Sequence, residues 1–192
     1  FSPGAPVQER DLFAGRIEQL STLVDAVEQR GRHALVFGER GGGKTSLVNI
    51  LHLVTQAPRR HIAYAKLNAE PDDTFTTLWR KIFKRLLLET REIEGHSARQ
   101  RLMDEMFGEL FCDDVQLALS AFPASVTPII VIDEFDRITD SRVPRMMADT
   151  LKALSDYSSS ATVVLVGVAE DVADLLEGHL SISRALLQVK MP

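Results

Sequence analysis

Cysteine, long apolar runs and excess basic charge are all scarce in this sequence, and each absence excludes a class of protein. Cys112 is the only cysteine in 192 residues, so the chain can form no internal disulfide and offers no cysteine-rich metal site. We expect Cys112 to be a small buried or half-buried side chain in a cytoplasmic protein, because disulfides are rare in that compartment. No run of about 18 or more apolar residues occurs, so the sequence predicts no membrane span.

The charge balance is mildly acidic. The chain has 22 Lys and Arg against 27 Asp and Glu, which gives a formal net charge of −5. Large nucleic-acid footprints are usually basic, so nucleic acid is a possible but disfavoured partner. The hydrophobic fraction of 45% is that of a globular chain, and the length suits one domain. We expect an extended lead-in at residues 1–11, where prolines and a glycine gather, and one core domain over residues 12–192.

Hydrophobic patterns predict strands and helices that alternate along the chain. Short apolar runs predict strands at 33–37, 61–67, 129–132, 162–166 and 186–191. Amphipathic spacing predicts helices at 15–29, 44–53, 75–88, 143–156 and 171–176. The run at 129–132 (IIVI) is apolar on both faces, which is typical of a central strand in a parallel sheet. The alternation predicts an α/β fold, with a parallel sheet between helices on both faces.

The stretch before the central strand has a weaker pattern. Helical spacing over Leu102, Met106, Phe107 and Leu110 predicts one helix, and a shorter helix is expected near 115–119. Pro123 and Pro128 follow and predict a loop. On the preceding predicted helix, Trp79 and Phe83 lie four residues apart, so we expect both to pack in the core.

One segment carries a phosphate-binding pattern. The sequence GERGGGKT matches G-x-x-x-x-G-K-[ST] and comprises Gly38, Glu39, Arg40, Gly41, Gly42, Gly43, Lys44 and Thr45. Glycines allow backbone N–H groups to approach phosphates, and the N-terminus of the following helix attracts anions. Lys44 is expected to reach the β- and γ-phosphates and the Thr45 hydroxyl to ligate Mg²⁺. The alternative is a glycine-rich turn with an exposed lysine; the strand before the segment and the helix after it favour the phosphate site.

An acidic pair follows the strongest predicted strand. Asp133 and Glu134 come directly after IIVI, and ligands of α/β sheets bind beyond the carboxyl ends of strands. Asp133 is the candidate for holding Mg²⁺ through water, and Glu134 the candidate for accepting a proton from an attacking water. A glutamate in this position favours hydrolysis over transfer to a second substrate. Taken alone the pair could simply begin a turn, and we interpret Asp136 and Arg137 as surface groups or indirect supports.

These residues together resemble the AAA+ and STAND-type P-loop ATPases, and in particular their initiator-like branch, over most of the chain. Four stretches in order carry the resemblance: FAGR at 13–16, GERGGGKTSL at 38–47, IIVIDEFD at 129–136, and VVLVGVAEDV with the arginine-bearing end of the chain. It implies a three-layer P-loop fold with sheet order 5-1-4-3-2. It also implies that Arg16 lies near the adenine, that Ser46 belongs to the nucleotide site, and that Arg184 acts on the γ-phosphate of a neighbouring subunit. The alternative for Arg184 is a surface arginine before a strand.

The chain departs from the family pattern in two places. Residues 167–170 (GVAE) lack the Asn, Thr or Asp that the family often uses to position water at the end of the fourth strand. The helical lid of the family would follow Pro192, so we expect the lid to be absent from this chain.

The resemblance leaves three functions open. The first is an ATP-binding and ATP-hydrolysing switch that needs Mg²⁺, forms a homo-oligomer when ATP is bound and works with other domains of the same protein. The second is an ADP-locked interaction module with negligible turnover, which the missing water-positioning residue favours. The third is a DNA-handling initiator-like ATPase, which the acidic charge disfavours. A small-molecule kinase is disfavoured because no substrate acid or base is evident.

Overall fold

The computed structural model describes residues 16–55, 61–90, 96–104, 107–168, 182 and 184–192. Its centre is a five-stranded sheet of order β2-β3-β4-β1-β5, in which every neighbouring pair is parallel. The strands are β1 (His33–Phe37), β2 (His61–Asn68), β3 (Val126–Asp133), β4 (Thr162–Gly167) and β5 (Leu186–Lys190). Counted from the other edge this is the order 5-1-4-3-2, so the expected sheet is confirmed.

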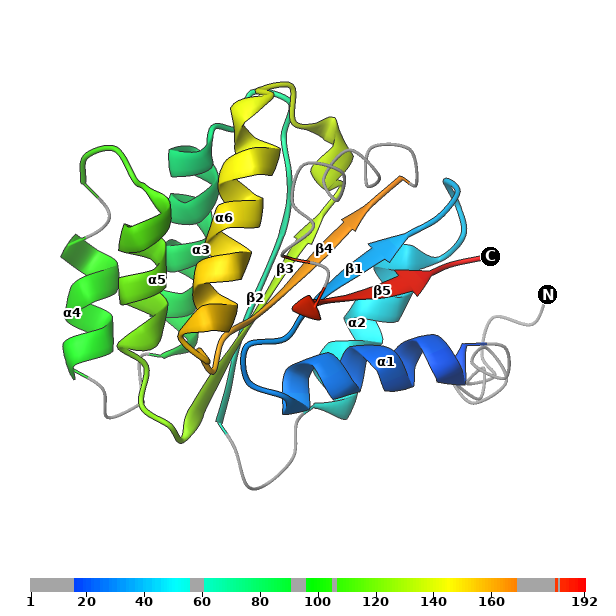
Figure 1. The fold of residues 1–192 in the computed structure, drawn as a ribbon, viewed down its shortest axis with the longest axis horizontal. Helices are drawn as coiled ribbons and strands as arrows, with labels where there is room; N and C mark the ends of the chain where they lie inside the picture. Colours follow the sequence, from blue (N-terminus) through cyan, green and yellow to red (C-terminus); the bar gives the residue numbers. More distant parts are fainter. Residues whose placement is uncertain (1–15, 56–60, 91–95, 105–106, 169–181, 183) are drawn as a thin grey trace, which may run out of the picture.

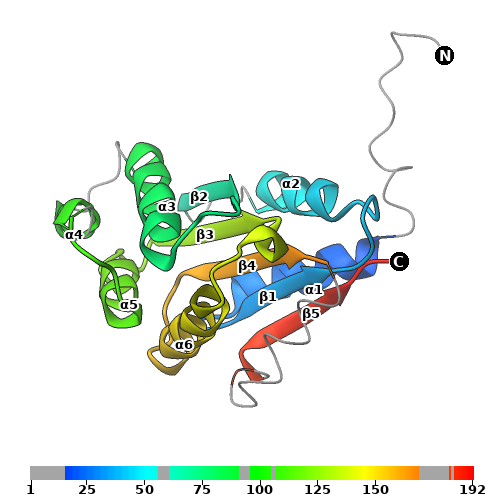
Figure 2. The ribbon, with the colours of Figure 1, turned by 90° about the horizontal axis from the view of Figure 1, so that it is seen from above.

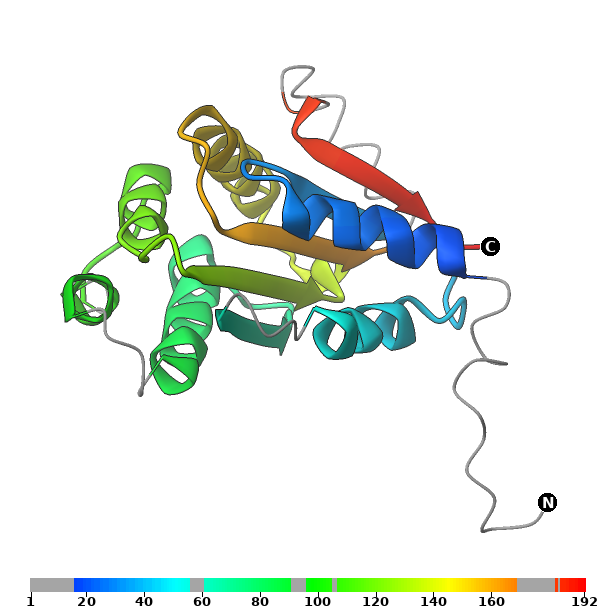
Figure 3. The same ribbon diagram turned by 90° about the horizontal axis from the view of Figure 1, so that it is seen from below.

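Helices cover both faces of the sheet (Figures 1 and 2). One face is covered by α1 (Ile17–Glu28) and α2 (Lys44–Val54). The other is covered by α3 (Phe75–Glu89), α5 (Cys112–Ser120) and α6 (Arg142–Asp156). The remaining helix, α4 (His96–Asp104), lies outermost, beside α3 and α5 (Figure 3). The three-layer arrangement predicted from the alternation is therefore confirmed.

The central strand β3 shows why its run IIVI at 129–132 contains no polar residue. All eight of its residues are buried. Ile130 and Ile132 join the core formed with α3, α5 and α6, whereas Ile129 and Val131 join the core formed with α1 and α2. A strand covered by helices on both faces needs apolar side chains at every position, so the alternation of polar and apolar residues is lost.

Helix α3 begins with a capping box. The Thr74 hydroxyl accepts from the Thr77 N–H at 3.2 Å, and the Thr77 hydroxyl accepts from the Thr74 N–H at 2.9 Å. These bonds satisfy backbone donors that a helix N-terminus otherwise leaves free. Trp79 and Phe83 are both fully buried, and their ring centroids lie 5.7 Å apart. Their expected place in the core is confirmed.

The predicted helix over residues 102–110 is wrong in its second half, because α4 ends at Asp104. Gly108 has a φ of +79°, a left-handed conformation that no α-helix contains. The Phe107 side chain is 83% exposed, whereas Leu110 is buried outside any helix with its N–H donating to the Thr76 hydroxyl at 3.0 Å. The apolar spacing therefore reflects Leu102 and Leu110 packing in the core from different local structures.

Pro128 was expected in a loop but lies within β3, so that prediction is wrong. It pairs with Ala63 of β2, while the pairing of β3 with β4 starts one residue later, at Ile129. Proline cannot donate a backbone hydrogen bond, and it is tolerated in a strand where one side has no ladder partner. Cys112 is half-buried, as expected.

The helix predicted at 171–176 and the lead-in predicted at 1–11 lie outside the described residues, so the structure does not test them. Over the part of the chain that the structure describes, no helix is both long enough and apolar enough to span a membrane.

Candidate functional site

The glycine-rich segment forms the loop between β1 and α2, at the carboxyl edge of the sheet. Gly41 and Gly43 have φ values of +80° and +83°, so both adopt the left-handed conformation that glycine tolerates best. The Lys44 ammonium lies over the loop and donates to the carbonyl oxygens of Gly38 and Glu39 at 2.8 and 2.7 Å. Lys44, which the sequence predicts to bind phosphate, is thus hydrogen-bonded to the backbone of its own loop.

Two neighbours support the loop from outside. Arg16, just before α1, donates from its Nη1 to the carbonyl oxygen of Gly43 at 3.5 Å. A Cβ on Gly43 would meet the Arg16 guanidinium, at 2.0 Å from its nearest atom. On the other side, the Met191 N–H donates to the Phe37 carbonyl at 2.7 Å. A Cβ on Gly38 would lie 2.8 Å from the Met191 carbonyl oxygen, so the end of β5 fixes glycine at that position.

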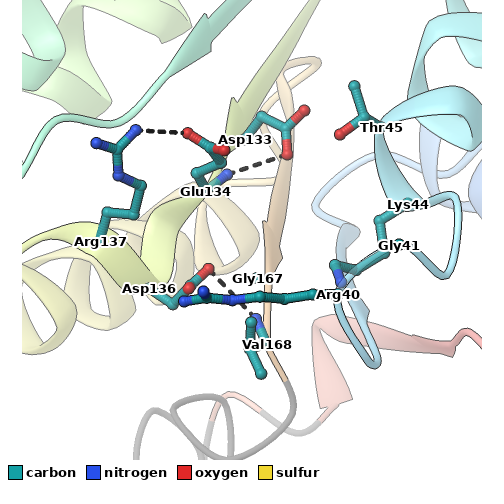
Figure 4. A pocket seen from close by; sticks show the side chains of 10 residues that line it. All are labelled: Arg40, Gly41, Lys44, Thr45, Asp133, Glu134, Asp136, Arg137, Gly167 and Val168. Atoms are coloured by element: carbon teal, nitrogen blue, oxygen red, sulfur yellow. Dashed lines mark hydrogen bonds and ion pairs between the residues drawn. The ribbon is translucent and has the colours of Figure 1, made fainter.

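Asp133 ends β3 with its carboxylate buried. Its Oδ1 accepts from the Glu134 N–H at 3.0 Å. Among the described residues, its Oδ2 accepts no hydrogen bond, although the Lys66 ammonium lies 3.4 Å away. Figure 4 shows this carboxylate facing the Thr45 side chain across the pocket. A buried carboxylate oxygen with unused lone pairs is poised to bind a cation or a water molecule.

Glu134 has an unusual backbone conformation and a charged partner. Its φ of +56° and ψ of +37° place a non-glycine residue in the left-handed region, which is uncommon and concentrated at functional sites. Its Oε2 forms an ion pair with the Arg137 Nη1 at 2.8 Å. Both side chains are about half exposed, at 46% and 48%, so solvent screens the pair and its groups can exchange partners.

Asp136 connects the acidic segment to the end of β4. Its Oδ1 accepts from the Val168 N–H at 3.3 Å. A Cβ on Gly167 would lie 3.1 Å from the same oxygen, tighter than ordinary van der Waals contact. A carboxylate from the neighbouring segment therefore reaches this strand end, where residues 167–168 have no polar side chain of their own.

These groups line one pocket of about 400 Å³ (Figure 4). Its lining residues are Arg40, Gly41, Lys44, Thr45, Asp133, Glu134, Asp136, Arg137, Gly167 and Val168. Six of them were predicted from the sequence: four belong to the glycine-rich segment and the first turn of its helix, and two are the acidic pair. The carboxyl ends of β1, β3 and β4 meet here, as parallel strands require.

Other predicted residues lie beside the pocket or away from it. Gly38, Glu39, Gly42 and Gly43 shape the loop through their backbone, and the Gly42 N–H donates to the Glu39 carbonyl at 3.2 Å. Ser46 is exposed in the first turn of α2. Arg184 is exposed, and its carbonyl oxygen accepts from the Arg32 guanidinium. The described residues that line the pocket do not include Arg184, so the single chain does not bring it to the loop.

Sequence reasoning missed the contribution of Asp136, Arg137, Gly167 and Val168 to the pocket. A signal existed for the first two, because they lie within four residues of Asp133 at the carboxyl end of the central strand. The strand end at Gly167 and Val168 was noted only for what it lacked. The Val168 N–H becomes part of the site because it donates a hydrogen bond to Asp136.

The residues present fit a Mg²⁺-bound nucleotide. Arg40, Lys44 and Arg137 supply positive charge, and the loop and the N-terminus of α2 supply the setting that favours phosphate. Among the described residues, no group of three or more His, Cys, Asp or Glu could hold a metal ion without help. Mg²⁺ in such sites binds through one or two protein oxygens plus phosphates and water. Thr45 and the free Oδ2 of Asp133 match that requirement.

Comparisons with known proteins also indicate a nucleotide-binding domain. The family model described as AAA domain matches residues 27–176. A search of curated proteins gave no match. Similar solved structures include ORC of Drosophila bound to DNA, with 19% identity and a TM-score of 0.58, covering 94% of this chain and 44% of that one. The ORC1 protein of Aeropyrum pernix in complex with DNA has 16% identity and a TM-score of 0.60, with 100% and 46% covered.

A Walker-type ATPase of Pyrococcus abyssi is also similar, at 14% identity and a TM-score of 0.50, with 98% of this chain and 57% of that one covered. This chain spans about half the length of these proteins, and identities this low show a shared fold. The family model, in contrast, covers most of the chain and includes both the glycine-rich loop and the acidic pair. The chain therefore belongs to the AAA-domain family and is an AAA+ P-loop ATPase domain.

Proposed function

We propose that this domain is the Mg²⁺-dependent, ATP-hydrolysing switch of a larger AAA+ protein. The observation that carries the proposal is one pocket lined by Lys44, Thr45 and Asp133, in which the buried Asp133 Oδ2 accepts no hydrogen bond from the described residues. A loop that merely turned the chain would need neither a buried carboxylate facing it nor a cluster of cations around it.

Nucleotide binding would use groups that are now engaged with the protein itself. Lys44 exchanges the carbonyl oxygens of Gly38 and Glu39 for phosphate oxygens, which accept stronger, charge-assisted hydrogen bonds. The exposed Arg40 contributes a second cation from the loop. Arg16 keeps its hydrogen bond to the Gly43 carbonyl oxygen, and the family resemblance puts the adenine end of the nucleotide near Arg16. Thr45 and Asp133 would hold Mg²⁺, which would supply positive charge to the phosphate oxygens.

Hydrolysis then requires a base and an in-line water. Glu134 accepts a proton from water while the water oxygen bonds to the γ-phosphorus and the bond from that phosphorus to the β–γ bridging oxygen breaks, leaving ADP and phosphate. Arg137 engages only the Oε2 of Glu134, so the second carboxylate oxygen accepts the proton while the ion pair stays formed. Asp136, held to Val168, supplies the polar group near the β4 end where the family often has one. Arg184 acts on the site of a neighbouring subunit.

Steady-state hydrolysis of Mg²⁺-ATP against protein concentration tests this proposal. We expect turnover per subunit to rise with concentration, and Glu134→Gln to reduce kcat by roughly 100-fold or more because the base is lost. Glu109→Gln, an exposed glutamate on another loop, is the matched control and should keep full activity. Equal turnover in Glu134→Gln and the unmodified chain would exclude Glu134 as the base.

An ADP-locked module is the second candidate. Glu134 is engaged with Arg137, and residues 167–168 offer no polar side chain of their own. Under this alternative the chain binds ADP tightly but neither it nor Glu134→Gln hydrolyses ATP at any protein concentration.

A DNA-handling role rests on the likeness to the two ORC structures, both of which contain DNA. The net charge of −5 gives this chain little attraction for phosphate backbones. DNA-stimulated turnover that falls as salt rises would favour this role over a DNA-independent switch.

A further inference from the structure

A lysine lies directly behind the carboxylate assigned to the metal. Lys66 projects from β2, the strand next to β3, and its Nζ lies 3.4 Å from the Asp133 Oδ2. Nothing in the phosphate-binding pattern or in the acidic pair calls for a cation at this place. No motif singles out Lys66, since β2 has the burial pattern of an ordinary alternating strand.

The lysine is held by a second contact. Its Nζ donates to the Asn49 Oδ1 at 2.6 Å. Asn49 lies on α2 four residues after Thr45, so the two side chains project from the same face of that helix, one turn apart. The ammonium is thus fixed between α2 and β3, next to the place where Thr45 and Asp133 face each other.

Lys66 neutralises the charge of the Asp133 carboxylate without donating a hydrogen bond to its Oδ2. The Asp133 side chain is only 4% exposed, and a buried carboxylate without a countercharge is costly. Lys66 supplies that countercharge, yet in the part of the chain that the structure describes the Asp133 Oδ2 accepts no hydrogen bond. The short hydrogen bond of the ammonium goes to Asn49, and none is formed with the Asp133 Oδ2, so the lone pairs of that oxygen remain available to a ligand in the pocket.

We propose that Lys66 is a resident cation that sets the metal requirement of the nucleotide site. This inference rests on the proposed function and extends it to the regulation of the same pocket. Without Mg²⁺, the Lys66 charge offsets the repulsion between Asp133 and the phosphates, so ADP stays bound. With Mg²⁺, the same charge repels the metal and weakens its hold on Asp133. Lys66 therefore narrows the difference in ADP affinity between the metal-free and metal-bound conditions.

The test measures ADP affinity by isothermal titration with excess Mg²⁺ and with EDTA, and compares the ratio of the two dissociation constants among variants. Lys66→Met removes the charge, and we expect the ratio of the EDTA value to the Mg²⁺ value to rise roughly tenfold or more. Lys66→Arg keeps the charge and should leave the ratio close to that of the unmodified chain. Lys152→Met, on the exposed face of α6, controls for loss of a lysine elsewhere.

Lys66→Gln repeats the test with a neutral side chain that keeps an N–H donor, which covers the case in which Lys66→Met does not fold. A rise in the ratio in the neutral variants with none in Lys66→Arg supports the inference. An unchanged ratio in folded neutral variants overturns it and leaves the proposed function standing. If the unmodified chain binds ADP under neither condition, the proposed function falls, and this inference with it.

Discussion

At the scale of single residues, His33 is a titratable side chain in the core that the site does not use. It lies in β1, is fully buried, and its Nδ1 accepts from the Val163 N–H at 3.2 Å. Burial lowers the pKa of His33 from 6.5 to about 4, because the charged imidazolium is poorly solvated there. Protonation at Nδ1 would also remove the acceptor of the Val163 bond. The folded state therefore holds the neutral form.

The first prediction concerns the pH dependence of stability. Below pH 6.5 the unfolded chain takes up a proton at His33 while the folded chain does not until about pH 4, so stability falls across that window. The total contribution is roughly 3 kcal/mol. Urea unfolding of His33→Asn, which keeps an acceptor at the same distance along the side chain, should show a shallower loss between these pH values. Identical pH slopes in the two proteins would mean that His33 titrates normally in the fold.

Single residues also mark the limit of sequence reasoning about the site. The loop and the acidic pair could be predicted because each is a local pattern whose spacing the chemistry dictates. Lys66 and Asn49 could not, because they are brought together only when β2 packs beside α2, and neither belongs to a motif. The part played by Asp136 was missed for the same reason, since its partner Val168 follows β4, far away in the sequence.

At the scale of elements, helix α3 packs one of its faces into the hydrophobic core. Its buried face includes Phe75, Leu78, Trp79, Ile82, Phe83 and Leu86. Leu88, on the opposite side, is 50% exposed. The amphipathic pattern therefore places this helix against the sheet, and the chain's only tryptophan reports on that packing.

The second prediction compares the two faces of α3. Phe83→Ala should lower the free energy of unfolding by about 3–5 kcal/mol, because it removes a buried ring and leaves a cavity. Leu88→Ala should change it by less than about 0.5 kcal/mol. Denaturant titration followed by Trp79 fluorescence measures both. Equal losses in the two variants would show that α3 does not pack through Phe83.

The helices and strands also show which structural features the spacing of apolar residues can predict and which it cannot. The strands and most helices follow from apolar runs and helical spacing, because burial on one or both faces sets those patterns. The end of α4 and the place of Pro128 do not. Leu102 and Leu110 reach one core from different local structures, and Pro128 is accepted because β4 has not yet begun to pair with β3.

At the scale of the whole molecule, the sheet brings loop and acidic pair together, but it leaves Arg184 outside the pocket. Sheet order could be predicted only through the family resemblance, since strand patterns alone do not rank neighbours. Arg184 is exposed beside the start of β5. If it serves a neighbouring subunit, each active site is divided between two chains.

The third prediction tests that division. Arg184→Ala should bind ATP as well as the unmodified chain does. It should hydrolyse ATP roughly 1,000-fold more slowly, because an arginine finger is lost. Mixing Arg184→Ala with Glu134→Gln should restore part of the activity, because a mixed interface can pair an intact Glu134 with an intact Arg184. No recovery on mixing, with both variants shown to assemble, would place Arg184 outside the reaction.

Nucleotide binding itself is the central claim, and Lys44 tests it most directly. Isothermal titration of Mg²⁺-ATP should show saturable binding to the unmodified chain and to Lys152→Ala, and binding weaker by roughly 100-fold to Lys44→Ala, which loses a charged donor to phosphate. Without ligand, the Lys44→Ala chain should unfold at nearly the same temperature, because its ammonium contacts the loop rather than the core. Equal ATP affinity in Lys44→Ala and the unmodified chain would contradict the account.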